Sequence, residues 1–144
     1  MSEYQAVRTS LEVGFPEGAE LPSAFAGCRG KNFRSIEPQT EFPFEDRQFE
    51  VVIMAAGALS TDSVKEAHRV LKPTGRLLFK VPAKTRHQEG YTMADIYSLV
   101  RYGFDIIRVD RPKWWYFGCR GNDITIFARK KNWKQLNNTF RPLV

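Results

Sequence analysis

Apolar residues recur along the chain with the periods of strands and helices. The clearest segment is residues 49–56, Phe-Glu-Val-Val-Ile-Met-Ala-Ala, a near-continuous apolar run that is typical of a central parallel strand covered on both faces. Shorter runs bounded by glycine, proline or polar turns predict further strands at residues 7–13, 32–37, 76–81, 104–109 and 123–129.

Helices are predicted between these strands. Ser63 with Glu66 has the spacing of a capping box, and apolar residues follow it at helical intervals. Thr92 with Asp95 repeats this pattern before a second helix. A short, weak helix is expected at residues 20–28, where a proline suits only the first turn.

This order of elements indicates an α/β domain that spans residues 1–144. Strands that alternate with helices imply right-handed crossovers and a mostly parallel sheet with helices on both faces. The last two strands have no helix between them, so we expect an antiparallel strand pair at one edge. No repeat or linker indicates a second domain.

Charge is divided unevenly between the two halves of the chain. Residues 1–64 contain 5 Lys and Arg against 10 Asp and Glu, whereas residues 65–144 contain 17 against 6. The basic half is either an ordinary solvated surface or a surface that attracts a polyanion. No recognised nucleic-acid motif accompanies it, so we do not expect nucleic acid to be the partner.

No segment suits a membrane or secretion. The longest apolar stretch, residues 51–59, is far shorter than the roughly 20 residues of a membrane-spanning helix, and the first residues lack the pattern of a signal peptide. Cys28 and Cys119 are either reduced thiols or one disulfide, and neither has a neighbour at metal-ligand spacing. We therefore expect a cytoplasmic protein with no metal site.

Two segments resemble motifs of the class I S-adenosylmethionine (SAM) methyltransferases, in particular those of type 11. Residues 42–52, Phe-Pro-Phe-Glu-Asp-Arg-Gln-Phe-Glu-Val-Val, are similar to the L-P-F-x-D-x-x-F-D-x-V lead into that family's fourth strand. Residues 69–77, Arg-Val-Leu-Lys-Pro-Thr-Gly-Arg-Leu, are similar to R-x-L-K-P-G-G-x-L before its fifth strand. The resemblance implies a Rossmann-like SAM-methyltransferase fold, although both segments also have a plain structural reading as turns that flank strands.

The resemblance also implies where the cofactor would lie. The family's first strand leads into L-E-V-G-C-G-T-G, whose glycines let backbone amides approach SAM. The matching residues 11–18 keep Gly14 and Gly18, but Pro16 replaces the middle glycine. Because proline has no amide donor and restricts the residue before it, we expect this loop to hold SAM poorly.

Other candidate cofactor residues follow two later strands. In the family, the turn after the fourth strand faces the cofactor, which makes Ala56 and Gly57, with Ala55, candidate lining residues. The family's second strand ends in an acid that holds the ribose hydroxyls, and Glu37 is either that acid or an ordinary surface carboxylate after the third strand. Only 13 residues separate Gly18 from the strand at residue 32, so one βα unit is expected to be missing.

A similar truncation occurs in the methyltransferase-like N-terminal domain of anamorsin-type proteins, which resembles this chain in its shortened first half. The prediction is therefore a SAM-dependent methyltransferase-like domain with a degenerate cofactor site, or a catalytically inactive domain of that fold that binds a protein. Trp114 and Trp115, in a loop rich in aromatic residues, bind such a partner or a ligand, stack on nucleic-acid bases, or cover the core or sheet edge. His68 and His87 have no readable partner, so no catalytic residue is assigned.

Overall fold

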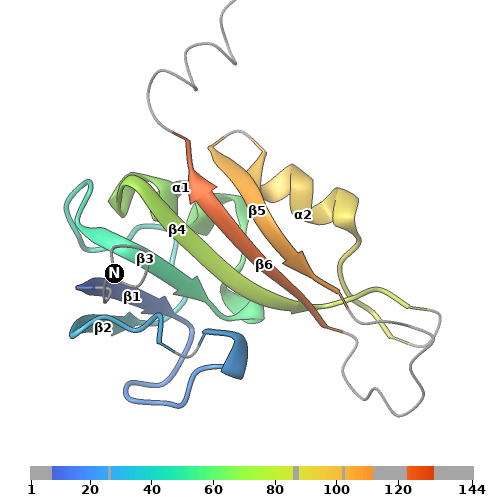
Figure 1. Ribbon diagram of the computed structural model, residues 1–144, viewed down its shortest axis with the longest axis horizontal. Coiled ribbons are helices and arrows are strands. Elements are labelled where there is room, and N and C mark those ends of the chain that lie inside the picture. The colour runs from blue at the N-terminus through green and yellow to red at the C-terminus, as the bar shows by residue number, and fades with distance from the viewer. Residues whose placement is uncertain (1–7, 26, 86–87, 102, 112–122, 132–144) are drawn as a thin grey trace, which may run out of the picture.

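A computed structural model describes residues 8–25, 27–85, 88–101, 103–111 and 123–131. Six strands form one sheet in the order β2-β1-β3-β4-β6-β5 (Figure 1). The strands are β1 (Thr9–Val13), β2 (Asn32–Ile36), β3 (Phe49–Met54), β4 (Leu71–Pro82), β5 (Phe104–Asp110) and β6 (Asp123–Lys130). The helices in these residue ranges are α1 (Thr61–Val70), α2 (Met93–Val100) and the 3-10 helices η2 (Ser23–Phe25) and η3 (Ala56–Ala58). No helix in the described ranges is long and apolar enough to cross a membrane.

The directions of the strands divide the sheet into two parts. Strands β2, β1, β3 and β4 are parallel to one another. Strand β6 runs antiparallel to both β4 and β5, and β5 forms the edge. This arrangement confirms the predicted α/β class and the mostly parallel sheet with an antiparallel pair at one edge.

The position of β2 identifies the missing unit. Doubly wound sheets of this kind have the strand order 3-2-1-4-5-6, so their second strand lies beside the first and their third lies outside it. Strand β2 pairs in register with β1, from Thr9 opposite Asn32 to Val13 opposite Ile36. It therefore occupies the place of the second strand. The place outside it is not filled by any strand in the described part of the chain.

Both α-helices cover the same face of the sheet. Successive strand residues point to opposite faces, and alternate residues of the central strands, such as Val13, Val52 and Leu77, contribute to the larger buried cluster. Val64 of α1 and Ile96 of α2 belong to the same cluster. Strands from both halves of the chain and the two α-helices thus build one continuous core, behind the sheet as it is seen in Figure 1.

The opposite face is covered by the loop between β1 and β2 rather than by an α-helix of the described chain. Phe25 of η2 is fully buried against Ile53 and Leu78 in the smaller core cluster. Its ring meets the ring of Phe127 edge to face, with 5.8 Å between the centroids. Phe25 of this three-residue helix, with Phe15, Leu21 and Cys28 of the same loop packed around the cluster, therefore takes the place of the packing face of a full helix.

The helix predicted at residues 20–28 is wrong in its extent. Among the described residues of this range only Ser23–Phe25 is helical, and it has 3-10 geometry. The Pro22 carbonyl accepts the Phe25 N–H at 2.9 Å, and Gly27 then has a positive φ of 85°. Such a φ suits glycine and ends helical geometry, because L-residues with a side chain seldom adopt it.

One predicted helix start is confirmed and the other is displaced. The Thr92 hydroxyl accepts the Asp95 N–H at 3.1 Å, and the Asp95 carboxylate accepts the Thr92 N–H at 2.8 Å. These bonds from Thr92 lower the pKa of Asp95. In α1, however, Ser60 is the N-cap and Ser63 is the reciprocal partner, so the predicted box of Ser63 with Glu66 is wrong. The carboxylate of Glu66 instead pairs with Arg69 and accepts the Phe42 N–H.

Candidate functional site

Three parallel strands end side by side where the sequence predicts the cofactor residues. The Gly14 N–H, just after β1, donates to the Ile36 carbonyl at the end of β2 at 2.9 Å. The Ala55 N–H, just after β3, donates to the Val13 carbonyl at 2.9 Å. The structure therefore brings Gly14, and the residues that follow Ile36 and Ala55, to one edge of the sheet. The carboxyl ends of parallel strands are where open α/β sheets bind ligands.

Gly14 lies in a crowded, left-handed position. Its φ is 87°, a conformation that strains any residue with a side chain. A Cβ at this position would lie 3.0 Å from the Ala55 Cβ and 3.1 Å from the Ala58 Cβ, and 3.7 Å from the ring of Pro38. Glycine is thus needed for close packing of three chain segments. The same contacts fill the space directly beside its α carbon.

The loop after Gly14 turns on itself instead of entering a helix. The Ala19 N–H donates to the Pro16 carbonyl at 3.0 Å, and Gly18 has a φ of 74° within this turn. Pro16 has no N–H to offer a ligand. Phe15 packs against the smaller core cluster. The first helical element beyond the turn is η2, which is too short to present the aligned amides of an α-helical N-terminus.

The remaining candidates differ in their exposure. Glu37 directly follows β2 and is exposed. Because β2 occupies the second-strand place, the alternative in which Glu37 follows a third strand is excluded. Ala56 and Gly57 form the start of η3, where Ala56 is partly buried against the core and Gly57 is exposed with open space beside its α carbon. Gly18 is likewise open to solvent.

Behind this edge is an ion pair that the sequence did not reveal. Glu12 of β1 is completely buried, and both of its carboxylate oxygens accept bonds from Arg29, at 2.5 Å from Nε and 2.7 Å from an Nη atom. Arg29 also donates to the Ala19 carbonyl at 2.6 Å, and its guanidinium lies 4.5 Å from the ring centre of Phe33. The hydrogen bond to Glu12 raises the pKa of Arg29. This planar, two-point contact fixes the short β1–β2 loop to the sheet.

The two family-like segments are joined by Arg69. Its guanidinium donates to the backbone carbonyls of Phe42 and Phe44 at 2.9 and 2.8 Å, and pairs with Asp46 and Glu66 at 2.8 and 2.9 Å. Glu66 in turn accepts the Phe42 N–H at 2.8 Å. The hydrogen bond from Arg69 is the main cause of the lowered pKa of Glu66. These residues therefore tie the segment before β3 to the end of α1.

His68 is also held in a structural environment. Its ring meets Phe104 edge to face at 5.4 Å, and it lies against Gly103, where a Cβ would clash with it. Its Nε2 atom is buried with no hydrogen-bond partner in the described structure. Burial, and secondarily the charge of Lys130, lowers the pKa of His68 to about 4. It is therefore neutral at pH 7.

Several sequence predictions cannot be placed on the structure. Trp114, Trp115, His87 and Cys119 lie outside the described residues. Within the described ranges, no group of three or more His, Cys, Asp or Glu side chains could hold a metal ion.

Comparisons with known proteins agree on the fold. No protein-family model and no curated protein matches the sequence. A putative methyltransferase from Bacillus halodurans is similar in structure, with a TM-score of 0.65 and 17% identity over 89% of this chain and 94% of that chain. A putative methyltransferase in complex with the Haloferax volcanii Trm112 methyltransferase activator has a TM-score of 0.64 and 13% identity over 89% and 84%. The cyclase SpnF has a TM-score of 0.60 and 14% identity over 88% and 75%.

These similarities cover nearly the whole chain at low identity, and they agree with the strand order and the two motif segments. The chain therefore has a shortened class I SAM-dependent methyltransferase fold.

Proposed function

We propose that this chain is a degenerate methyltransferase domain that no longer transfers methyl groups and that acts by binding a protein. The observation that carries the proposal is the loop after β1. It contains Pro16 in place of an amide donor, closes in a turn at Ala19 and leads only into the three-residue η2. A SAM site needs several backbone amides in this region, and the loop supplies few of them.

The ion pair behind the loop supports the same conclusion. In place of a helix, Arg29 attaches the loop to buried Glu12 and to the Ala19 carbonyl. A guanidinium in contact with three oxygens stabilises the loop in its short form. Rebuilding a longer cofactor-binding loop would require breaking this contact and leaving a buried carboxylate unpaired, which is costly.

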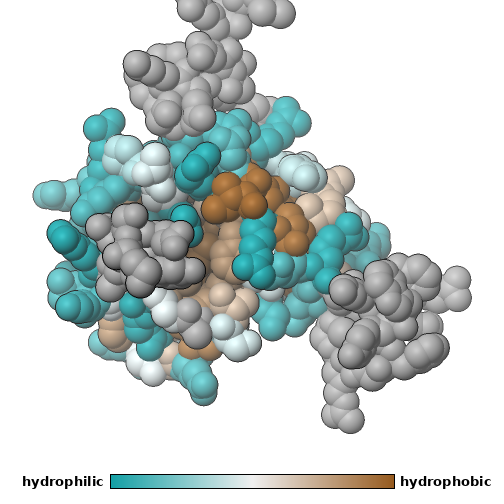
Figure 2. Space-filling view, viewed as in Figure 1, coloured by the Kyte–Doolittle hydropathy of each residue, from teal (hydrophilic) through white to brown (hydrophobic). Residues whose placement is uncertain are grey.

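The surface supports a role in protein binding. Figure 2 shows apolar side chains surrounded by hydrophilic ones over strands β5 and β6. Ile107 on β5 is 43% exposed. Tyr97, 51% exposed, lies on α2, which covers the other face of the sheet, so it is not part of this patch. Aromatic and large apolar side chains of this kind are enriched at the centres of protein interfaces. One of the structurally similar methyltransferases is known in complex with an activator protein, so this fold accommodates a bound partner. We propose that Trp114 and Trp115 add to the binding surface.

Calorimetric titration with SAM and with S-adenosylhomocysteine tests the loss of the cofactor. We expect no heat of binding at millimolar ligand from a chain whose circular dichroism shows it to be folded. Binding with a micromolar Kd would contradict the proposal. Replacement of Trp114 and Trp115 by alanine, with Trp133 replaced as the matched control, then tests the binding surface once a partner has been isolated.

A second candidate function is a SAM-dependent methyltransferase that retains weak binding. It is favoured by Glu37, which is exposed immediately after the second-position strand, where an acid can reach the hydroxyls of a ribose. In this version, Gly14, Gly18, Ala56 and Gly57 line the cofactor with Glu37. The Glu37→Gln substitution would then weaken binding of S-adenosylhomocysteine, whereas Glu41→Gln, a change at an exposed acid four residues away, would not.

A further inference from the structure

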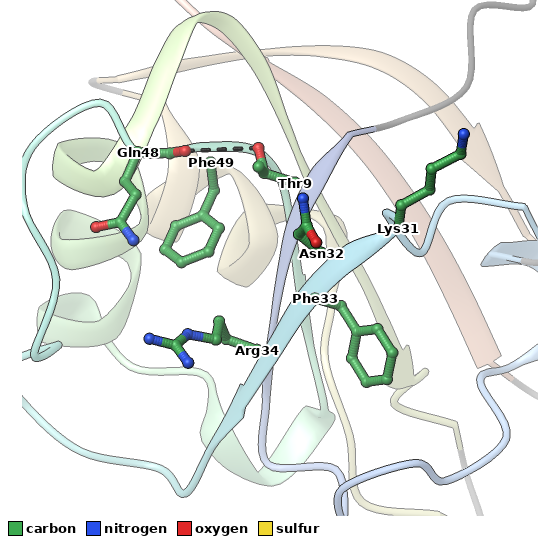
Figure 3. A pocket seen from close by; sticks show the side chains of 7 residues that line it. All are labelled: Thr9, Lys31, Asn32, Phe33, Arg34, Gln48 and Phe49. Atoms are coloured by element: carbon green, nitrogen blue, oxygen red, sulfur yellow. Dashed lines mark hydrogen bonds between the residues drawn. The ribbon is translucent and has the colours of Figure 1, made fainter.

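A pocket lies at the opposite edge of the sheet from the predicted cofactor residues. Its volume is about 360 Å³. It opens where β1, β2 and β3 begin, and it is lined by Thr9, Lys31, Asn32, Phe33, Arg34, Gln48 and Phe49 (Figure 3). Pockets of this size are large enough for a small organic ligand.

Phe49 lies at the base of the pocket and is almost completely buried. Phe49 is 2% exposed, and its ring meets the ring of Phe44 edge to face at 5.0 Å. Figure 3 shows the side chains of Arg34 and Gln48 on the same side of β2 as Phe49, while Phe33 projects from the other side. The Arg34 guanidinium lies 6.0 Å from the ring centre of Phe44. A flat ring that enters the pocket would thus meet the planar Arg34 cation and only the small exposed edge of Phe49.

The hydrogen-bonding groups around the opening are mainly donors. In the described structure, neither Arg34 nor Lys31 forms an ion pair. The Gln48 Oε1 atom accepts the Glu45 N–H at 3.1 Å, which orients its side-chain amide and leaves the two Nε2 protons for another acceptor. The Thr9 hydroxyl has no proton left to donate to a ligand, because it donates to the Gln48 carbonyl. It also accepts the Glu50 N–H.

The local charge is positive although this half of the chain is acidic. Residues 1–64 have only 5 basic residues, and two of them, Lys31 and Arg34, line this pocket. Glu50 follows Phe49 in β3, so its side chain points to the opposite face of the sheet, where it accepts the Arg8 N–H at 3.2 Å. By the same alternation Lys31 lies on the Phe33 side of β2, at the rim of the pocket, and Arg34 on the Phe49 side. The exposed acid Glu45 lies near the Gln48 amide, to which its backbone N–H donates. An unpaired arginine beside an oriented amide suits an oxyanion, which arginine binds through two parallel hydrogen bonds.

We propose that this pocket binds a small organic acid that joins an oxyanion to a flat ring, either an aromatic carboxylate or an aromatic phosphate ester. Arg34 binds the oxyanion, Gln48 donates the amide hydrogens, and Lys31 at the rim raises the local positive potential. The ring lies in the pocket beside Arg34 and meets Phe49 only at its small exposed edge. The site is separated from the cofactor edge by the length of strand β1, about 15 Å, so the two sites do not overlap.

The test is a titration of the full ¹⁵N-labelled chain with phenyl phosphate and with benzoate, followed by NMR. The proposal expects saturable shifts of the amides of residues 31–34 and 48–49. Inorganic phosphate and benzyl alcohol, which each supply half of the ligand, should bind at least about 10-fold more weakly. Comparing the affinity of phenyl phosphate with that of benzoate shows whether the pocket binds a phosphate group or a carboxylate group.

Two matched variants complete the test. Arg34→Gln should weaken binding about 10-fold or more, because it removes a charge-assisted hydrogen-bond donor. Arg129→Gln, which removes the same charge from an exposed position on β6, should leave the affinity unchanged. The proposal is overturned if neither acid shifts these amides at millimolar concentration, if inorganic phosphate binds as tightly as phenyl phosphate, or if the two variants bind alike.

Discussion

Replacement of Arg29 by methionine is expected to destabilise the whole fold, because it leaves Glu12 buried and unpaired. Glu12 is 0% exposed, and the substitution removes both of its short contacts as well as the bond to the Ala19 carbonyl. Breaking a buried ion pair by removing one partner costs about 3–5 kcal/mol. Because the Arg29 side chain is 26% exposed, we expect a value near the lower end, about 3 kcal/mol.

The measurement is urea unfolding followed by circular dichroism, with a double-mutant cycle. Arg29→Lys keeps the charge but loses the two-point contact, so it should cost less than Arg29→Met. The double variant with Glu12→Leu removes the unpaired carboxylate, and it should recover most of the lost stability. The reasoning would be refuted if Arg29→Met cost less than about 1 kcal/mol, or if the two single effects simply added in the double variant.

Three further predictions concern the core of the domain. Arg69→Met should lower the unfolding free energy by about 2–4 kcal/mol in urea titrations, since it removes bonds to two carbonyls and two carboxylates. Gly14→Ala should lower the unfolding free energy by about 2–3 kcal/mol through backbone strain and crowding. Gly18→Ala should lower it by only about 1 kcal/mol, because Gly18 also has a positive φ but has open space beside its α carbon. Equal losses of stability in the two variants would contradict the role of crowding at Gly14. Because its folded pKa is lowered to about 4, His68 should make the protein lose stability as the pH falls from about 6.5 towards 4, by about 2 kcal/mol after allowance for partial exposure. His68→Gln should flatten that part of the pH profile.

The sequence predicted the part of the fold around β3 and α1 correctly. There the local hydrophobic pattern and the two motif segments indicate the same structure. The apolar run at residues 49–56 specified a buried central strand, and the structure confirms it as β3. The two motif segments on either side of α1 predicted the correct architecture. Arg69 explains why, because it ties them together through hydrogen bonds that depend on their spacing.

Other features could not be predicted because they depend on contacts across the sheet. Nothing near Glu12 in the sequence marks Arg29 as its partner, 17 positions away, since an isolated acid and an isolated base look like surface residues. The start of α1 was misplaced because Glu66, which fits a capping box, is instead recruited by Phe42 and Arg69. The pocket at Arg34 depends on the register of β2 with β1, which only the pairing reveals.

At the cofactor edge, the sequence predicted the turn at Gly14 but not which strand Glu37 follows. Gly14 pointed correctly to a loop that bends sharply, as its positive φ shows; that Pro16 leaves this loop too few donors for SAM stays a prediction. The sequence left open whether Glu37 follows the second or the third strand, and pairing of β2 with β1 decides for the second. Loss of SAM binding is a conclusion from the loop, and it stays a prediction.

The most direct test of this account follows the backbone amides of Gly14, Gly18, Glu37, Ala56 and Gly57 by NMR while S-adenosylhomocysteine is added to the labelled chain. The account predicts that these signals do not move at millimolar ligand, while the rest of the spectrum shows a folded protein. Saturable shifts at all three strand ends, with a Kd in the micromolar range, would show that the cofactor site has survived and would contradict the central claim.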